Sequence, residues 1–203
     1  IGQIALCGLT TGICNVAIGR SALMSSTTGC RNIAIGEAAM GGADTTGKCN
    51  IALGVTAMDA LTTGLDNIAM GTNAHGAGTT GSWNVSLGKG AFATASTGCL
   101  NVAIGNNALG GAITTGNDNV AIGQNSMDAL TTGACNIALG QHALGATTVG
   151  VYNVAIGISA MSGVTTAQAD DNIAIGRSAL VGTAATEGNS NIAIGTTAMD
   201  ALT

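Results

Sequence analysis

One pattern of apolar and polar positions recurs along the whole chain. It reads Asn, then Ile or Val, then a small residue, then Ile, Leu or Met, then Gly, and it occurs eleven times at intervals of 17 to 19 residues. A period this short is typical of a solenoid, in which each repeat is one turn of the chain. The copies begin at Asn15, Asn32, Asn50, Asn67, Asn84, Asn101, Asn119, Asn136, Asn153, Asn172 and Asn191.

Each copy has the periodicity of a short β-strand. With the Asn numbered as position 0, large apolar residues at positions 1 and 3 flank a position 2 that is Ala in every copy except Ser86. Alternate residues of a strand face opposite ways, so positions 1 and 3 share one face. We expect that face to be buried, together with a second apolar row at position 8 that includes Leu109 and Met127. Position 2 is then expected to point outward.

Two further positions predict how the coils stack. The Asn of position 0 is expected to form a ladder of amide hydrogen bonds from coil to coil. Position 4 is Gly in every copy, which indicates a positive φ or a contact too close for a side chain. These turn glycines are Gly19, Gly36, Gly54, Gly71, Gly88, Gly105, Gly123, Gly140, Gly157, Gly176 and Gly195.

The pattern therefore predicts an all-β protein, a parallel β-solenoid of the β-roll or β-helix type with one coil per 17–19-residue repeat. Residues 1–203 read as a single repeat region of about eleven coils. The polar segment ending in Thr-Thr-Gly absorbs the length changes and is expected to form turns. Helices are excluded, because recurrent Gly and paired Thr would interrupt each one. The chain begins and ends within a repeat, so we expect it to be a piece of a longer protein.

The composition suggests self-association. Charged residues make up only 7%, the net charge is −5, and there is one Trp, one Tyr and one Phe. Soluble proteins usually carry about a quarter charged residues, so copies of the chain are expected to cover part of its surface. The chain has no basic patch of the kind that would indicate a nucleic-acid partner. No apolar run is long enough for membrane insertion. The candidate subunit interface is the outward row of position 2, represented by Ala17, Ala34, Ala52, Ala69, Ala103 and Ala121.

The cysteines leave two interpretations open. Cys14, Cys30 and Cys49 lie at similar places in three successive coils. Because neighbouring coils are about 4.8 Å apart, a Cys14–Cys30 or Cys30–Cys49 disulfide is within reach. The alternative is that these are free thiols. The chain has no Cys-x-x-Cys motif, which argues against a zinc or redox site.

The titratable residues do not converge. His75 falls in the apolar row of position 8, and His142 lies four coils away at position 6. His75 is expected to be a core substitution, although a trimer could bring three copies around an ion. The acids Asp59, Asp128 and Asp200 share position 9 in distant coils. No Ser-His-Asp arrangement is evident, so we expect no catalytic residues, cofactor or metal, and no enzyme activity.

The repeat phrase followed by Thr-Thr-Gly resembles two families across essentially the whole chain. One is the head region of trimeric autotransporter adhesins, whose repeats also centre on Val-Ala-Ile-Gly. The other is the repeat region of phage tail fibres, in which Asn-x-Ala-x-Gly-x-x-Ala-Leu alternates with Thr-Thr-Gly turns. The adhesin heads are left-handed β-rolls of three chains around one axis, so the resemblance implies a left-handed, trimeric solenoid. Their repeats are shorter, and the present period is more like that of the tail fibres.

Three functions follow as hypotheses. The first is a stiff structural and adhesive fibre segment, a homotrimer of a phage tail fibre or bacterial surface adhesin, located on a virion or cell surface and engaging a host glycan or protein. The second is a subunit of a self-assembling extracellular filament. The third is an ice-binding solenoid, although adjacent Thr residues on a strand would point to opposite faces.

Overall fold

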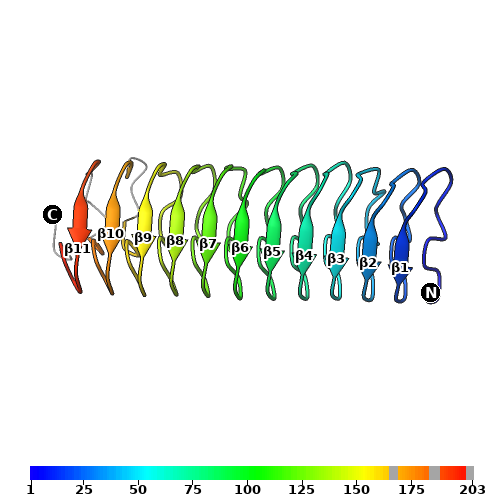
Figure 1. Ribbon diagram of the computed structural model, residues 1–203, viewed down its shortest axis with the longest axis horizontal. Coiled ribbons are helices and arrows are strands. Elements are labelled where there is room, and N and C mark those ends of the chain that lie inside the picture. Colours follow the sequence, from blue (N-terminus) through cyan, green and yellow to red (C-terminus); the bar gives the residue numbers. More distant parts are fainter. Residues whose placement is uncertain (165–168, 183–187, 200–203) are drawn as a thin grey trace.

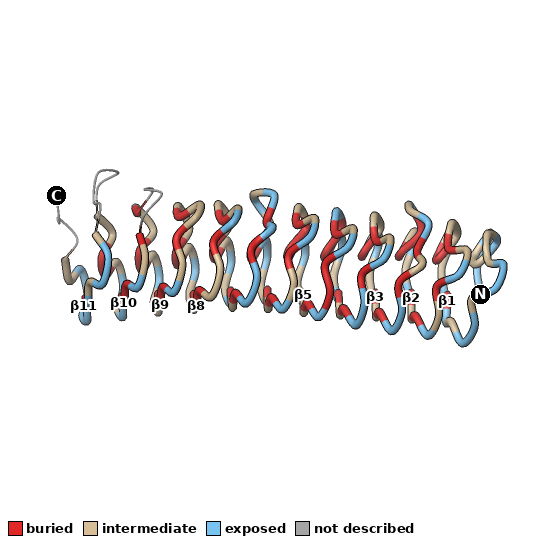
Figure 2. The backbone as a smooth tube through the Cα atoms, turned by 90° about the horizontal axis from the view of Figure 1, so that it is seen from above, coloured by how far each residue is buried: buried red, intermediate tan, exposed pale blue. Residues whose placement is uncertain are grey.

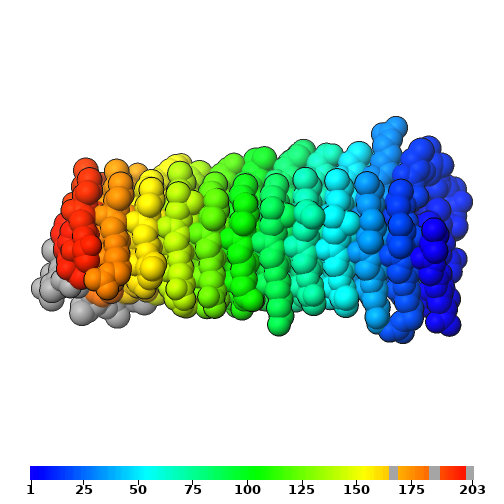
Figure 3. Space-filling view, turned by 60° about the horizontal axis from the view of Figure 1, so that its bottom comes forward, coloured from blue at the N-terminus to red at the C-terminus, as the bar shows by residue number. Residues whose placement is uncertain are grey.

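The protein is a rod of stacked coils in a computed structural model that describes residues 1–164, 169–182 and 188–199 (Figures 1 and 3). Each coil contributes one three-residue strand, and the strands follow one another in chain order in a single eleven-stranded sheet. No helix occurs within the described residues, and the predicted all-β parallel solenoid is confirmed. The strands are β1 (Val16–Ile18), β2 (Ile33–Ile35), β3 (Ile51–Leu53), β4 (Ile68–Met70), β5 (Val85–Leu87), β6 (Val102–Ile104), β7 (Val120–Ile122), β8 (Ile137–Leu139), β9 (Val154–Ile156), β10 (Ile173–Ile175) and β11 (Ile192–Ile194).

The sheet pairs equivalent positions of neighbouring coils. Val102, Ala103 and Ile104 of β6 lie beside Val120, Ala121 and Ile122 of β7, all in parallel, and the same register holds along the whole sheet. Insertions in the polar segment leave this register unchanged, because the coils with longer intervals still align from their Asn residues. Every column of the rod therefore contains one position of the repeat.

The sheet faces the opposite way from the sequence prediction. The side chains at position 2 point inward, and those of Ala34, Ala103 and Ala121 have no exposed surface. The large residues at positions 1 and 3 point outward, and Ile104 is only partly buried. The predicted burial of positions 1 and 3 is wrong, whereas that of position 8 is confirmed by fully buried Leu109.

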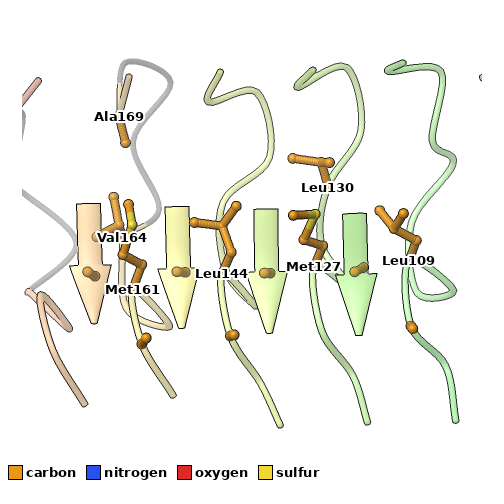
Figure 4. Packing of buried hydrophobic residues seen from close by; sticks show 14 of the residues in the cluster. Leu109, Met127, Leu130, Leu144, Met161, Val164 and Ala169 are labelled. Carbon is orange, nitrogen blue, oxygen red and sulfur yellow. The ribbon is translucent and has the colours of Figure 1, made fainter. Parts of the chain in front are cut away.

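The narrow interior explains this orientation. In Figure 4 the large side chains Leu109, Met127 and Leu144 reach across the coil toward the short side chains of the strands. A leucine or methionine from position 8 fills most of the space inside a coil, so only a methyl group fits opposite. Interiors are packed nearly without voids, and a second large residue from the strand would overfill this one. Burial repeats in the same places in successive coils (Figure 2).

Left-handed backbone closes each coil. In the coil that begins at Asn119, the residues at positions −1, 6 and 8 are Asp118, Asn125 and Met127, with φ of 58°, 52° and 52°. This conformation costs an L-residue about 1–2 kcal/mol. Each of these residues donates its N–H to the neighbouring coil, as Met127 does to the carbonyl of Ala143. The strained corners are therefore held by hydrogen bonds that run along the rod.

The turn glycine follows the strand at position 4. Gly123 has a φ of +135°, and a Cβ there would lie 2.5 Å from the carbonyl oxygen of Gly140 in the next coil. The predicted positive φ and the predicted close contact both occur. Glycine is required because neither the backbone angle nor the stacking distance accommodates a side chain.

Candidate protein interface

The outer face of the sheet is a continuous apolar surface. Two side chains from every strand, at positions 1 and 3, point away from the coil interior, and all of them are Val, Ile, Leu or Met. Val16, Met70 and Ile137 are 43%, 44% and 39% exposed. We call these two columns the outer apolar face.

The area of this face is large for a single chain. We estimate on the order of 1,000 Å² of apolar surface from the two columns, compared with about 800 Å² that each partner contributes to a standard protein interface. Contiguous apolar patches of monomeric proteins seldom exceed a few hundred Å². A uniform apolar strip of this size is the expected feature of a surface that another macromolecule covers.

Two columns of exposed, varied residues border the face. The column at position −1 precedes each Asn and contains Trp83 and Tyr152, which are 55% and 60% exposed. The column at position 5 follows each turn glycine and contains Ile158, 53% exposed, and the charged residues Lys89 and Arg177. We call these columns the N-side rim and the C-side rim. They differ from coil to coil, whereas the face between them does not.

The predicted interface row lies inside the coil. Ala17 is 6% exposed, and Ala34, Ala52, Ala69, Ala103 and Ala121 are fully buried in a single chain. A second chain cannot contact these residues while the coil is folded. The assignment of the position 2 row to a subunit interface is therefore wrong, and the surface available for one is the neighbouring set of side chains at positions 1 and 3.

The asparagine ladder runs the whole length of the sheet, as predicted. Asn119 donates its backbone N–H and its Nδ2 to Oδ1 of Asn101, at 3.0 and 3.1 Å. Its Nδ2 also donates to the carbonyl of Gly133 at 3.0 Å, and its own Oδ1 accepts from Asn136. The nine asparagines from Asn32 to Asn172 are buried. They satisfy the backbone at the start of each strand and do not face a ligand.

His75 and Ser86 are the polar exceptions in two inward columns. His75 stands at position 8 with its ring centroid 5.0 Å from that of Phe92, and burial lowers its pKa from 6.5 to about 4. Its Nδ1 and the Oγ of Ser86 lack hydrogen-bond partners among the described residues. A Cβ on Gly78 would lie 2.0 Å from the His75 ring, so this glycine makes room for it. His75 is a core substitution and cannot reach another chain to share an ion.

One shallow pocket brings together a carboxylate, an imidazole and two hydroxyl groups from neighbouring coils. Asp128, His142, Ser159 and Ser162 line a pocket of about 420 Å³, together with Gly145 and Ala146. Burial raises the pKa of the Asp128 carboxyl, and the charge of His142 opposes this effect. No hydrogen bond joins these side chains within the described part of the chain, so they do not form a relay. The third position 9 acid, Asp200, lies outside the described residues.

The cysteines form no bridge, and the potential metal ligands form no cluster, in the described part of the chain. All six cysteines are free thiols, and Cys7, Cys14 and Cys49 are exposed. Within residues 1–164, 169–182 and 188–199, no group of three or more His, Cys, Asp or Glu side chains could hold a metal ion. In the same ranges, no helix has the length and hydropathy needed to cross a membrane.

The threonines of the Thr-Thr-Gly turns divide into two columns. The hydroxyl of the first Thr in each pair donates to the next coil. Thr62 donates to the carbonyl of Thr79 at 2.9 Å, and Thr131 donates to the carbonyl of Thr148 at 2.9 Å. The second Thr of the pair, such as Thr63, is exposed. One exposed column remains, rather than the flat pair of threonine rows that would order water.

Comparison with known proteins adds no relative: no family model matches the chain, and neither the curated proteins nor the solved structures contain a match.

Proposed function

We propose that this chain is a stiff, self-associating segment of a fibre, a homotrimer of the phage tail-fibre or bacterial surface adhesin type. The trimer axis would run parallel to the stack of coils, and the coils would wind left-handed, as in the adhesin heads that the repeats resemble. The role is structural and adhesive rather than enzymatic. The fibre would lie on a virion or cell surface and hold exposed turns, or a neighbouring domain, against a host glycan or protein.

The outer apolar face carries this proposal. Two apolar side chains per coil line one side of the rod from β1 to β11, and among the described residues all of them stay at least partly exposed. Burial of apolar surface contributes about 25 cal/mol per Å², which is enough to drive association once the costs of ordering are met. Three such faces around one axis would enclose a common apolar core that runs the length of the fibre.

The test is the mass of the chain in solution. Sedimentation equilibrium of the wild-type protein should give a trimer. Substituting Ile104→Lys and Ile122→Lys places charges at the centre of the outer apolar face, and we expect monomers whose far-UV circular dichroism remains that of the wild type, because both side chains point away from the coil interior.

The matched control introduces the same charges elsewhere. Thr97 and Thr132 are exposed turn residues that precede Gly98 and Gly133, so Thr97→Lys with Thr132→Lys should leave the trimer intact. A wild-type chain that sediments as a monomer at every concentration would exclude the proposal.

A further inference from the structure

The outer apolar face cannot by itself align two chains. Its two columns repeat the same residue types in every coil, so sliding one chain along another by a coil would preserve the apolar contact. A repetitive face specifies register weakly. The information that distinguishes one level from another lies in the two rims, because only these exposed columns beside the face change from coil to coil.

Two coils carry opposite charges on the two rims. In the tenth coil, Asp171 on the N-side rim faces outward at the same level as Arg177 on the C-side rim, and in the second coil Arg31 shares its level with Glu37. No coil carries like charges on both rims. From the first coil to the last, the residues of the two rims are Cys14 and Arg20, Arg31 and Glu37, Cys49 and Val55, Asp66 and Thr72, Trp83 and Lys89, Leu100 and Asn106, Asp118 and Gln124, Cys135 and Gln141, Tyr152 and Ile158, Asp171 and Arg177, and Ser190 and Thr196.

These pairs do not meet within one chain. The two rims lie on opposite sides of a three-residue strand, which by itself spans about 10 Å at strand spacing. The one ion pair among the described residues joins Arg20 to Glu37, both on the C-side rim. The described contacts therefore reveal no role for the opposite charges of Asp171 and Arg177 within a single chain.

We propose that the N-side rim of one copy of this chain contacts the C-side rim of the next, coil against the same coil, in a parallel and unstaggered ring. The inference rests on the proposed function, because it takes the self-associating fibre as given and assigns its alignment. Rotation about an axis parallel to the stack leaves the level of every coil unchanged. It brings the two rims of neighbouring chains together, with Asp171 beside Arg177 and Trp83 beside Lys89 in an aromatic–cation contact.

Displaced arrangements lose these contacts. A slip of one coil in one direction places Arg31 beside Arg20, which repel each other. A slip in the other direction places Arg31 beside Val55 and Glu37 beside Cys14. It forms one charge pair, Asp66 with Lys89, and one aromatic–cation contact, Tyr152 with Arg177, whereas the unstaggered ring has two charge pairs and one aromatic–cation contact. Charge pairs at the rim of an interface mainly set partner and register, because like charges in contact penalise the wrong alignment. The rims thus favour the closed ring over a staggered, open assembly.

An antiparallel assembly would use the same charges differently. A two-fold axis perpendicular to the stack would pair the tenth coil with the second, so that Asp171 would meet Arg31 and Arg177 would meet Glu37. The two arrangements respond oppositely when both charges of the tenth coil are exchanged, because only in the parallel ring do those two residues contact each other. This difference provides the test.

The experiment measures the dissociation constant of the assembly for Asp171→Arg, for Arg177→Glu and for the double variant. Each single substitution puts like charges together at every contact of the parallel ring and should weaken assembly by about tenfold or more at low salt. The double variant restores opposite charges and should return to within about threefold of the wild type. Thr132→Arg, a charge added in a turn, should have no effect, and circular dichroism should show all variants folded.

The outcomes separate the two proposals. If the single substitutions leave assembly unchanged while the Ile104→Lys, Ile122→Lys variant dissociates, the rim alignment is wrong and the fibre proposal stands. If the double variant assembles more weakly than either single variant, the chains are antiparallel and the unstaggered ring is excluded. A monomeric wild-type chain overturns both proposals.

Discussion

At the scale of single residues, His75 is the clearest departure from the repeat. The other residues of its column are Leu, Met or Phe, and the buried apolar core divides at this point into one cluster ending at Ala74 and another beginning at Ala91. Burial keeps the imidazole neutral by lowering its pKa to about 4. Folding of the rod is therefore coupled to the protonation of His75, in the fourth coil.

This coupling predicts acid-dependent stability. The unfolded chain binds a proton at His75 near pH 6.5, whereas the folded chain resists protonation down to about pH 4. The stability from the neutral form is fully present above pH 6.5 and is lost as the pH falls toward 4. The loss is about 3 kcal/mol at pH 4. Urea denaturation between pH 7 and pH 4 measures it.

A comparison variant isolates the histidine. His75→Leu introduces the residue found in this column at Leu23 and Leu109, and the free energy of unfolding should then vary much less between pH 6.5 and pH 4. An unchanged pH profile in this variant would show that other groups cause the acid sensitivity.

At the scale of the coil, the asparagine ladder joins the elements. Each Asn side chain supplies hydrogen bonds to backbone groups that would otherwise lack partners where the strand begins. It bonds both the preceding coil and the following coil. Buried donors and acceptors without partners cost about 1–3 kcal/mol each. A single ladder residue therefore influences two neighbouring coil contacts.

Substitution in the ladder should destabilise the rod locally. Asn119→Ala leaves the carbonyl of Gly133 and the backbone N–H of Asn136 without their partners, and we expect a loss of roughly 3 kcal/mol. Asn106→Ala, on the exposed C-side rim, should change stability by less than about 0.5 kcal/mol. Thermal and urea denaturation of both variants check this, and equal stabilities would contradict a structural role for the ladder.

The sequence predicts the elements of the coil more completely than it predicts which face of the strand is buried. The alternation around Ala103 places the strand correctly, the Asn and Gly positions predict the ladder and the close turn, and Leu109 is buried as expected. Alternation only states that Ala103 and Ile104 face opposite ways. Deciding which is inside requires the width of the coil, and this depends on left-handed corners at residues such as Met127 that carry no sequence signal. The sequence alone therefore places the interface on the wrong side of the strand.

At the scale of the whole molecule, the rod is a one-dimensional stack. Each coil contacts only its neighbours, so stability is approximately a sum over coils and their contacts. Lateral assembly adds a second requirement. Chains that contact each other through their rims must have equivalent coils at the same height along the whole rod. The fold of one chain tolerates a change in the number of coils, whereas the proposed contact between unequal chains does not.

Removing one whole repeat tests both properties. Deletion of residues 101–118 joins Leu100 to Asn119 and restores the repeat pattern across the junction. The shortened chain should keep its circular dichroism spectrum and form trimers with itself, because every copy changes equally. Mixed with the full-length chain it should form few mixed trimers, since beyond the deletion each rim residue lies one coil out of level. Native mass spectrometry after co-refolding separates the species. Deletion of residues 101–109, half a coil, should prevent folding of the following repeats, and a statistical mixture of full-length and shortened chains would show that the rims do not set the alignment.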